Sequence, residues 1–157
     1  LEMDYVNVIL DSMKNYEKKV LEEKVPFLGI CVGLQIIFEH SEEGDVDCLG
    51  WLKGKVVGFD RKKVRVPQIG WNELVFKKES KMIGNLAEHP YFYFVNSYYA
   101  VPENKEDILA VSDYEGEFTA MIQHENIFAS QCHIEKSGEV GLKVLKNFCE
   151  LGGVKSC

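Results

Sequence analysis

The chain has 157 residues, 46% of which are hydrophobic, so it is long and apolar enough to form one domain with its own core. Its formal net charge of −7 argues against nucleic acid as the main partner, because phosphate binding requires clustered cations. No apolar run approaches the roughly twenty residues of a transmembrane helix, and we expect no signal peptide. We therefore expect a cytoplasmic protein that binds neither nucleic acid nor membrane.

The five cysteines, at positions 31, 48, 132, 149 and 157, form no Cys-x-x-Cys pair and leave one without a partner. This pattern favours neither a zinc site nor a disulfide framework, and it fits a reducing compartment. The only basic cluster, residues 61–65, is followed by two further lysines at positions 77 and 78. We interpret this cluster as a solvated hairpin and not as a nucleic-acid site.

The first predicted element is a helix over residues 4–23, where hydrophobic side chains recur largely at helical spacing and the other face carries Lys and Glu. It ends before Pro26 and is expected to cover one face of a sheet. The apolar run at 25–30 contains too few polar residues for a half-exposed strand, which predicts a central parallel strand covered on both faces. Residues 41–45 are predicted to form a loop.

Downstream, runs rich in β-branched and aromatic residues predict short strands, separated by turns, at 55–59, 63–66, 73–76, 91–101, 108–112, 118–123 and 127–132. Residues 67–72 contain Gly-Trp-Asn, which is predicted to form a turn with an exposed indole. A final helix is predicted over residues 139–151, with its cap near Ser137. No repeat, low-complexity tract or linker marks a second domain, so residues 1–157 are expected to form one domain.

The candidate nucleophile is Cys31, which lies between Gly29 and Gly33 at the end of the apolar run 25–30. A tight turn from a strand into a helix requires small residues beside the nucleophile, and it projects the thiol onto a helix N-terminus. The helix dipole at that point is expected to lower the thiol pKa. Taken alone, the motif fits a buried structural cysteine equally well.

The second candidate group is His133, which follows the apolar run 127–132 and has Glu135 two positions later. In a Cys-His-Glu triad the imidazole takes the thiol proton and later protonates the leaving amine, while the carboxylate fixes the imidazole tautomer. Side chains at i and i+2 share one face of an extended segment, although a turn at the strand end could equally bring the two together. Taken alone, a His-x-Glu is usually a surface pair.

Together these segments resemble the class I glutamine amidotransferases, whose motifs are Gly-x-Cys-x-Gly-x-Gln and His-Pro-Glu. Here the corresponding residues are Gly29-Ile-Cys-Val-Gly-Leu-Gln35 and His133-Ile-Glu135. Within the family, the resemblance is greatest to the glutaminase subunits of imidazole glycerol phosphate synthase. It runs from about residue 3 to residue 148 and rests on four segments in the right order, which are residues 26–39, 66–72, 93–99 and 135–137.

The resemblance implies an α/β fold of the flavodoxin-like type, a three-layer sandwich with a mostly parallel central sheet. It also implies an enzyme that hydrolyses glutamine to glutamate and ammonia and that needs no metal or organic cofactor. The ammonia would pass to a (β/α)₈-barrel cyclase subunit that closes an imidazole ring, which places the expected heterodimer in histidine biosynthesis.

Further site residues follow only from the resemblance. The implied contacts to the substrate glutamine are Gln35, Glu43, Ser97 and Tyr98. The implied oxyanion donor is the backbone amide of Val32, and the implied partner-interface residues are Trp71, Asn72 and Lys136. Each has a structural alternative: Gln35 could cap its helix, Glu43 could be one of several loop acids, and Trp71 could be buried under its own loop.

The chain departs from the family pattern in three ways. The family begins with a strand, a helix and a second strand, and this chain is expected to lack that amino-terminal segment together with one oxyanion amide. Ile134 replaces the proline between the catalytic residues, for which we expect a modest effect. Asn96 replaces a histidine and Cys132 an aromatic residue, and Asn96 can still donate and accept hydrogen bonds.

Two other interpretations stay open. A paralogous amidotransferase subunit that supplies ammonia for the modification of surface sugars would have almost the same motifs. A non-enzymatic fragment would keep the partner surface while lacking hydrolysis, although the intact Cys31, His133 and Glu135 argue against long degeneration of the site.

Overall fold

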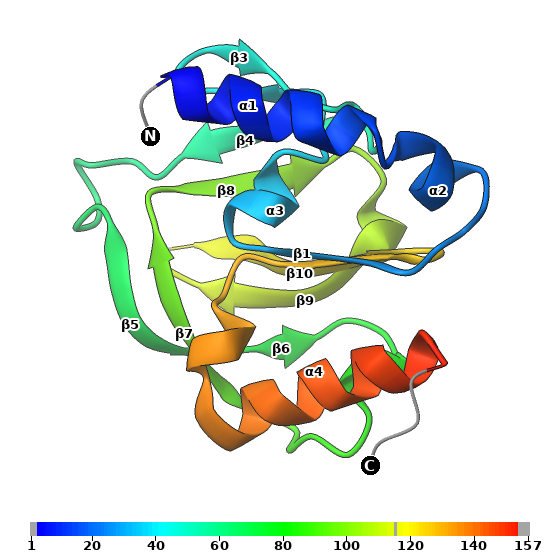
Figure 1. The fold of residues 1–157 in the computed structure, drawn as a ribbon. Coiled ribbons are helices and arrows are strands. Elements are labelled where there is room, and N and C mark those ends of the chain that lie inside the picture. The colour runs from blue at the N-terminus through cyan, green and yellow to red at the C-terminus, as the bar shows by residue number, and fades with distance from the viewer. Residues whose placement is uncertain (1–2, 115, 154–157) are drawn as a thin grey trace.

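A computed structural model describes residues 3–114 and 116–153. Its largest sheet has five strands in the order β1-β11-β10-β9-β6, which are Phe27–Ile30, Ile127–Ser130, Glu117–His124, Ile108–Asp113 and Val75–Phe76. Three helices lie on one side of this sheet (Figure 1), namely α1 (Met3–Lys14), α2 (Glu17–Leu21) and α3 (Val32–Gln35). Helix α4 (Gly138–Leu151) lies on the other side. The helix-sheet-helix layering expected from the sequence is confirmed.

The strand directions in this sheet are mixed, which corrects the expectation of a mostly parallel sheet. β1 pairs with β11 in parallel, whereas the other three strand pairs are antiparallel. β10 follows β9, and β11 follows β10, through tight turns. A parallel pair would instead require a crossover of about a dozen residues or more, so these connections allow only antiparallel neighbours.

Two hydrophobic clusters pack on the sheet. One contains Leu10 of α1 and Leu34 of α3, and the other contains Val144 of α4. Along β11 the side chains alternate between them: Ile127 and Ala129 belong to the first cluster, and Phe128 to the second. Because successive strand residues point to opposite faces, the clusters cover the two faces of the sheet.

β1 is not the central strand that its apolar sequence predicts. Among the described residues it lies at the edge of the five-stranded sheet. Its side chains nevertheless pack on both faces, because Phe27 contacts the first cluster while Leu28 and Ile30 contact the second. The apolar run therefore predicts correctly that both faces of the strand are covered. It does not predict whether the strand has a neighbour on each side within the sheet.

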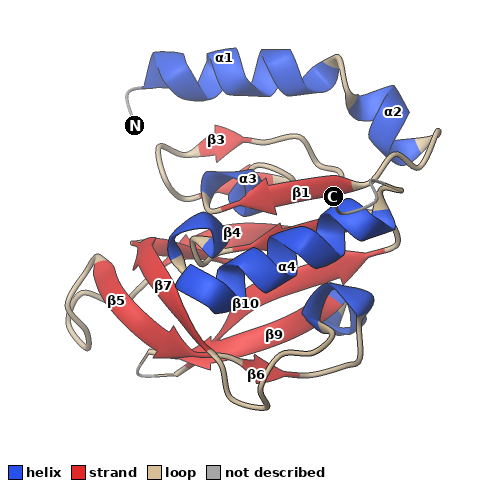
Figure 2. Cartoon of the chain, turned by 60° about the horizontal axis from the view of Figure 1, so that its bottom comes forward, coloured by secondary structure: helices blue, strands red, loops and turns tan. Residues whose placement is uncertain are grey.

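Two smaller sheets complete the fold. The first has the order β3-β2-β4-β8, with strands Val46–Asp47, His40–Ser41, Gly54–Gly58 and Tyr98–Pro102. The second pairs β5 (Gln68–Glu73) with β7 (Tyr91–Asn96) as an antiparallel ribbon at one end of the molecule (Figure 2). The predicted strand over 91–101 is thus divided at Ser97 between two sheets. The predicted loop at 41–45 is the turn that joins β2 to β3.

The helix predicted over residues 4–23 is in fact two helices, α1 and α2, which are separated at Asn15 and Tyr16. Asn and Tyr are weaker helix formers than the Lys and Glu residues around them, which favours a break at this point. Helix α4 follows Ser137 as predicted, but the Ser137 side chain makes no cap hydrogen bond.

No strand forms over residues 63–66, which lie at and after a turn at residues 61–63. Its geometry is set by Asp60, whose side chain accepts the N–H of Lys62 at 2.9 Å and whose carbonyl oxygen accepts the N–H of Lys63 at 2.9 Å. Conversely, no turn forms over residues 67–72, because residues 68–72 belong to strand β5. Its hydrogen-bonding partner is β7, which lies farther along the chain.

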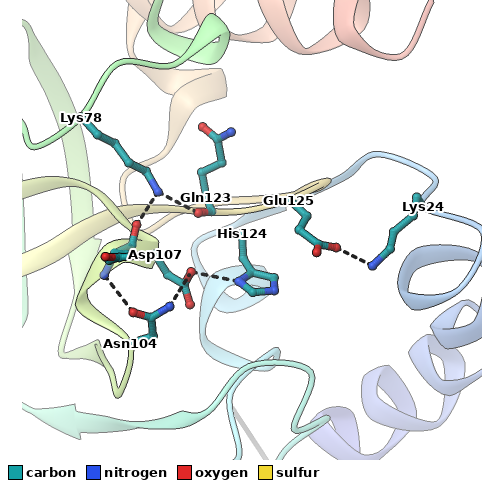
Figure 3. A network of polar contacts seen from close by, with 8 residues as sticks. Lys24, Lys78, Asn104, Asp107, Gln123, His124 and Glu125 are labelled. Carbon is teal, nitrogen blue, oxygen red and sulfur yellow. Dashed lines mark hydrogen bonds and ion pairs between the residues drawn. The ribbon is translucent and has the colours of Figure 1, made fainter.

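Polar contacts hold the turn between β10 and β11, as Figure 3 shows. His124 Nδ1 lies 2.9 Å from Asp107 Oδ1, which ties the end of β10 to the short helix η2 (Lys105–Asp107). Lys78 Nζ donates to the carbonyl oxygen of Gln123 at 3.0 Å. Glu125, two residues after Gln123, forms an ion pair with Lys24 at the surface.

Asn126 connects this turn to the start of β1. Its Nδ2 donates to the carbonyl oxygens of Val20 and Val25, each at 2.8 Å, and its own carbonyl oxygen accepts the N–H of Phe27 at 2.9 Å. The parallel register that follows pairs Phe27 with Ile127. Asn126 therefore sets the alignment of β1 with β11.

We predict that Asn126→Asp destabilises the protein by about 1–3 kcal/mol, because the new oxygen would face two carbonyl oxygens that lose their donor. The matched control is Glu125→Gln in the same turn, which breaks only an exposed ion pair and is expected to change stability little. Urea unfolding of the two variants measures the difference, and equal midpoints would contradict the role given to Asn126.

Candidate active site

Cys31 lies at a sharp turn between β1 and α3. Its backbone has φ 54° and ψ −108°, a conformation that non-glycine residues rarely adopt. A Cβ atom on Gly29 would lie 2.4 Å from the carbonyl oxygen of Gly33, whereas a Cβ on Gly33 would meet nothing within 4 Å. The strand-turn-helix predicted around the cysteine is present, and the close approach of the two segments requires glycine only at position 29.

The thiol lies in a cavity of about 280 Å³. Its lining includes all four predicted substrate residues and the predicted oxyanion residue, which are Gln35, Glu43, Ser97, Tyr98 and Val32. Cys31 Sγ lies 3.9 Å from the carbonyl oxygen of Val95 and 3.9 Å from Gln131 Nε2. The residues implied by the family resemblance thus share one cavity with the candidate nucleophile.

Burial raises the pKa of the Cys31 thiol above its ordinary value. The backbone N–H of Val32 acts in the opposite direction, while the carboxylates of Glu135 and Glu43 raise the pKa further and the ammonium of Lys136 lowers it. The lowering expected at the start of α3 is thus present in the Val32 N–H, but burial outweighs it and the net pKa is raised. Helix α3 has only four residues, so its dipole is small compared with the cost of burying a thiolate.

His133 and Glu135 follow β11, the strand that pairs with β1. His133 Nδ1 lies 2.7 Å from Glu135 Oε1 across η3 (Ile134–Lys136), so the turn at the strand end, and not an extended segment, brings the two together. The backbone N–H of His133 donates to the carbonyl oxygen of Tyr93 at 2.8 Å. The Ser137 hydroxyl donates to the His133 carbonyl oxygen at 2.6 Å.

The parallel pairing of β1 and β11 brings both catalytic candidates to one end of the sheet. The N–H of Cys31 donates to the carbonyl oxygen of Ser130 at 2.7 Å, three residues before His133. Among the described residues no hydrogen bond joins the Cys31 thiol to the imidazole; its acceptor is the carbonyl oxygen of Val95. The structure therefore brings the two groups to neighbouring strand ends without linking them directly.

The exchanges that depart from the family pattern are accommodated by packing. Ile134 is 1% exposed and Cys132 is fully buried, and both belong to the cluster under α4. Burial raises the pKa of the Cys132 thiol to about 12, so this cysteine is not a second nucleophile. Asn96 donates through Nδ2 to the carbonyl oxygen of Tyr98 at 3.0 Å.

Gln131 contacts the candidate nucleophile and is not among the residues predicted from the sequence. Its side chain is fully buried, its Nε2 faces Cys31, and its Oε1 accepts a hydrogen bond from Gln35 Nε2 at 3.0 Å. A polar residue at the end of an otherwise apolar strand was the available signal, because a buried amide requires hydrogen-bonding partners.

An apolar face lies next to the site on the β5–β7 ribbon. Ile69, Trp71 and Tyr91 are 64%, 56% and 54% exposed, and the Trp71 and Tyr93 rings are in contact with centroids 5.9 Å apart. The alternative that Trp71 is buried under its own loop is wrong. Lys136 is also exposed.

The side chain of Asn72 is engaged within the fold. Its Nδ2 donates to the carbonyl oxygen of Asp113 at 2.8 Å, and its Oδ1 accepts the N–H of Glu73 at 2.8 Å. Asn72 alternates with Trp71 along β5 and so points to the opposite face of the strand.

Within residues 3–114 and 116–153, no group of three or more His, Cys, Asp and Glu side chains is arranged to hold a metal ion. In the same part of the chain, no helix is both long and apolar enough to span a membrane.

Residues 6–151 match the family described as Glutamine amidotransferase class-I. The chain belongs to this family. It is 43% identical over 136 residues to the imidazole glycerol phosphate synthase subunit HisH of Leptospira borgpetersenii, with 84% of this chain and 67% of that protein covered. It is also 43% identical over 145 residues to the HisH subunit of Neisseria meningitidis serogroup B, with 88% and 68% covered.

Solved structures agree on the fold of this class I amidotransferase domain. A putative GMP synthase subunit from Thermoplasma acidophilum superposes with a TM-score of 0.69 at 20% identity, covering 94% of this chain and 67% of that one. A glutamine amidotransferase from Thermotoga maritima gives a TM-score of 0.61 at 17% identity, covering 96% and 54%. The family resemblance and the α/β fold class predicted from the motifs are confirmed.

The two glycines of the amidotransferase motif are predicted to differ in their tolerance of a side chain. Gly29→Ala should cost about 1–3 kcal/mol, because its Cβ would overlap the backbone of Gly33. Gly33→Ala, the matched control, meets open space inside a helical turn and should not destabilise the fold. Chemical denaturation of both variants measures this, and equal losses of stability would show that the close approach at Gly29 is not required.

Proposed function

We propose that this chain is the glutaminase subunit of an imidazole glycerol phosphate synthase, which hydrolyses glutamine and delivers ammonia to a cyclase subunit. Membership of the class I family and the similarity to HisH subunits support the proposal. The observation that carries it is the placement of Cys31 in a cavity at the end of β1, beside the β11 segment that leads to the His133–Glu135 pair.

The proposed chemistry is acyl transfer in two steps. The Cys31 sulfur attacks the side-chain amide carbon of glutamine, His133 takes the thiol proton, and the same proton leaves with ammonia as the C–N bond breaks. Water, deprotonated by His133, then attacks the thioester carbon, which releases glutamate and restores the thiol. Glu135 accepts a hydrogen bond from the Nδ1–H of His133, which keeps the proton on Nδ1 and leaves Nε2 free to act as the base.

The cavity residues have complementary proposed roles. The N–H of Val32 lies beside the Cys31 sulfur and would donate to the oxyanion. Glu43 supplies a carboxylate for the α-ammonium of glutamine, and Ser97 and Tyr98 line the same cavity. Both hydrogens of Gln35 Nε2 are donated within the protein, so only its carbonyl oxygen is available to the substrate.

We further propose that turnover depends on a partner. Strand β7 contacts both catalytic candidates, since the carbonyl oxygen of Val95 faces the thiol and that of Tyr93 holds the N–H of His133. The other strand of the ribbon carries the exposed Ile69 and Trp71. A (β/α)₈-barrel cyclase docked there, with Lys136 near its edge, would press on β7 and align the two groups. The heterodimer would act in the cytoplasm and need no cofactor.

The first test is glutamate release from glutamine, measured with and without the cyclase subunit, with Cys31→Ala as the blank. We expect little release by the chain alone, clear release with the cyclase, and none from Cys31→Ala. Glu135→Gln should lower the rate by about 10²–10⁴-fold, because the imidazole loses the acceptor that fixes its tautomer. Full release before the cyclase is added would contradict partner dependence, and a complex that releases no glutamate would indicate a binding module.

The second test concerns the docking face. Trp71→Ala should weaken binding to the cyclase by at least about 2 kcal/mol, as expected for a central aromatic anchor. The control is Val8→Ala on α1, which removes an apolar side chain that is 64% exposed and belongs to a helix outside the β5–β7 ribbon. Isothermal titration calorimetry of each variant with the cyclase measures the change in binding free energy. An equal loss of affinity in both variants would exclude the ribbon as the interface.

A further inference from the structure

A chain of amide groups leads from the Cys31 sulfur into the protein. Gln131 Nε2 lies 3.9 Å from the sulfur, and Gln131 Oε1 accepts from Gln35 Nε2 at 3.0 Å. Gln35 Nε2 also donates to the carbonyl oxygen of Tyr98 at 3.2 Å, and Asn96 Nδ2 donates to the same oxygen at 3.0 Å. The three side chains are buried, Gln131 completely.

The orientation of each of these side-chain amides is determined by one backbone group, the carbonyl oxygen of Tyr98. The Tyr98 carbonyl oxygen can only accept, so Gln35 must turn its NH₂ group toward it. The same NH₂ group reaches Gln131, which must therefore present its oxygen to Gln35. Gln131 is left with its NH₂ group facing Cys31, because reversing the Gln131 amide would place its NH₂ group against the NH₂ group of Gln35.

We propose that Gln131 stabilises the thiolate of Cys31 by donating an N–H to its sulfur, and that Gln35 positions Gln131 for this contact. The proposal rests on the proposed role of Cys31 as nucleophile. In the resting protein the thiol proton points to the carbonyl oxygen of Val95, a group that stabilises the protonated form only. After proton transfer the sulfur becomes an acceptor, and hydrogen bonds to a charged acceptor shorten and strengthen.

The charges around the Cys31 sulfur make the N–H donor of Gln131 important. Glu43, from the turn between β2 and β3, and Glu135, from η3, both disfavour the thiolate, while Lys136 of η3 favours it. His133 follows on the same segment and is the proposed proton acceptor. Among the described residues, the hydrogen-bond donors next to the sulfur are the Val32 N–H and the Gln131 amide. Loss of Gln131 would therefore remove one of these two neutral groups, which offset burial and the carboxylates.

The test is the pH dependence of Cys31 alkylation by iodoacetamide, followed by mass spectrometry of the peptide that contains Cys31. Gln131→Met keeps an unbranched side chain and removes the donor. We expect its alkylation profile to move to higher pH by about one unit, which makes the reaction about tenfold slower at any pH below the midpoint. Gln35→Met, which does not contact the sulfur, should shift the profile in the same direction by less.

Gln123→Met is the matched control, since Gln123 lies on β10 outside this chain of amides and its Oε1 is buried without a partner. Its profile should superpose on that of the unmodified protein. A folded Gln131→Met protein with an unshifted profile would overturn the proposal, and if that variant does not fold, an unshifted Gln35→Met profile would do so. Alkylation needs no glutamine, so the result is independent of whether the chain hydrolyses it.

Discussion

The parallel pairing of β1 with β11 is the constraint on which the rest of the site depends. Among the described residues it is the only parallel pair in the five-stranded sheet, and it brings together segments about a hundred positions apart in sequence. Asn126 sets its register, because its side chain donates to the carbonyl oxygens of Val20 and Val25 before β1 and its own carbonyl oxygen accepts the N–H of Phe27. Because both strands run the same way, Cys31 and Gln131 leave the sheet side by side, and the His133–Glu135 turn follows directly.

Burial gives the site its electrostatic character. A thiol removed from water and flanked by two carboxylates has a raised pKa, so its reactivity depends on groups that favour the anion. Those groups come from separate elements: the Val32 N–H from α3, the ammonium of Lys136 from η3 and the amide of Gln131 from the end of β11. The β7 strand contacts the same centre and continues into an exposed aromatic face, so binding at the surface and chemistry in the cavity share one structural element.

The site was more predictable from the sequence than the sheet was. The turn at Cys31 could be predicted because it depends on local sterics around Gly29, and the His133–Glu135 pair because its two members are close in sequence. Strand directions, the edge position of β1 and the strand at 67–72 depend on partners that are distant in sequence. Gln131 was missed for the same reason: its role follows from contacts with Cys31 and Gln35, which lie about a hundred residues earlier.

The central claim, that this pairing builds a glutamine site around Cys31, is tested most directly by covalent trapping. The chain would be treated with a diazoketone analogue of glutamine, and the modified residue located by peptide mass spectrometry. The account predicts a single adduct on Cys31 that free glutamine suppresses. An adduct on the exposed Cys149, or labelling of Cys31 that glutamine does not reduce, would contradict it.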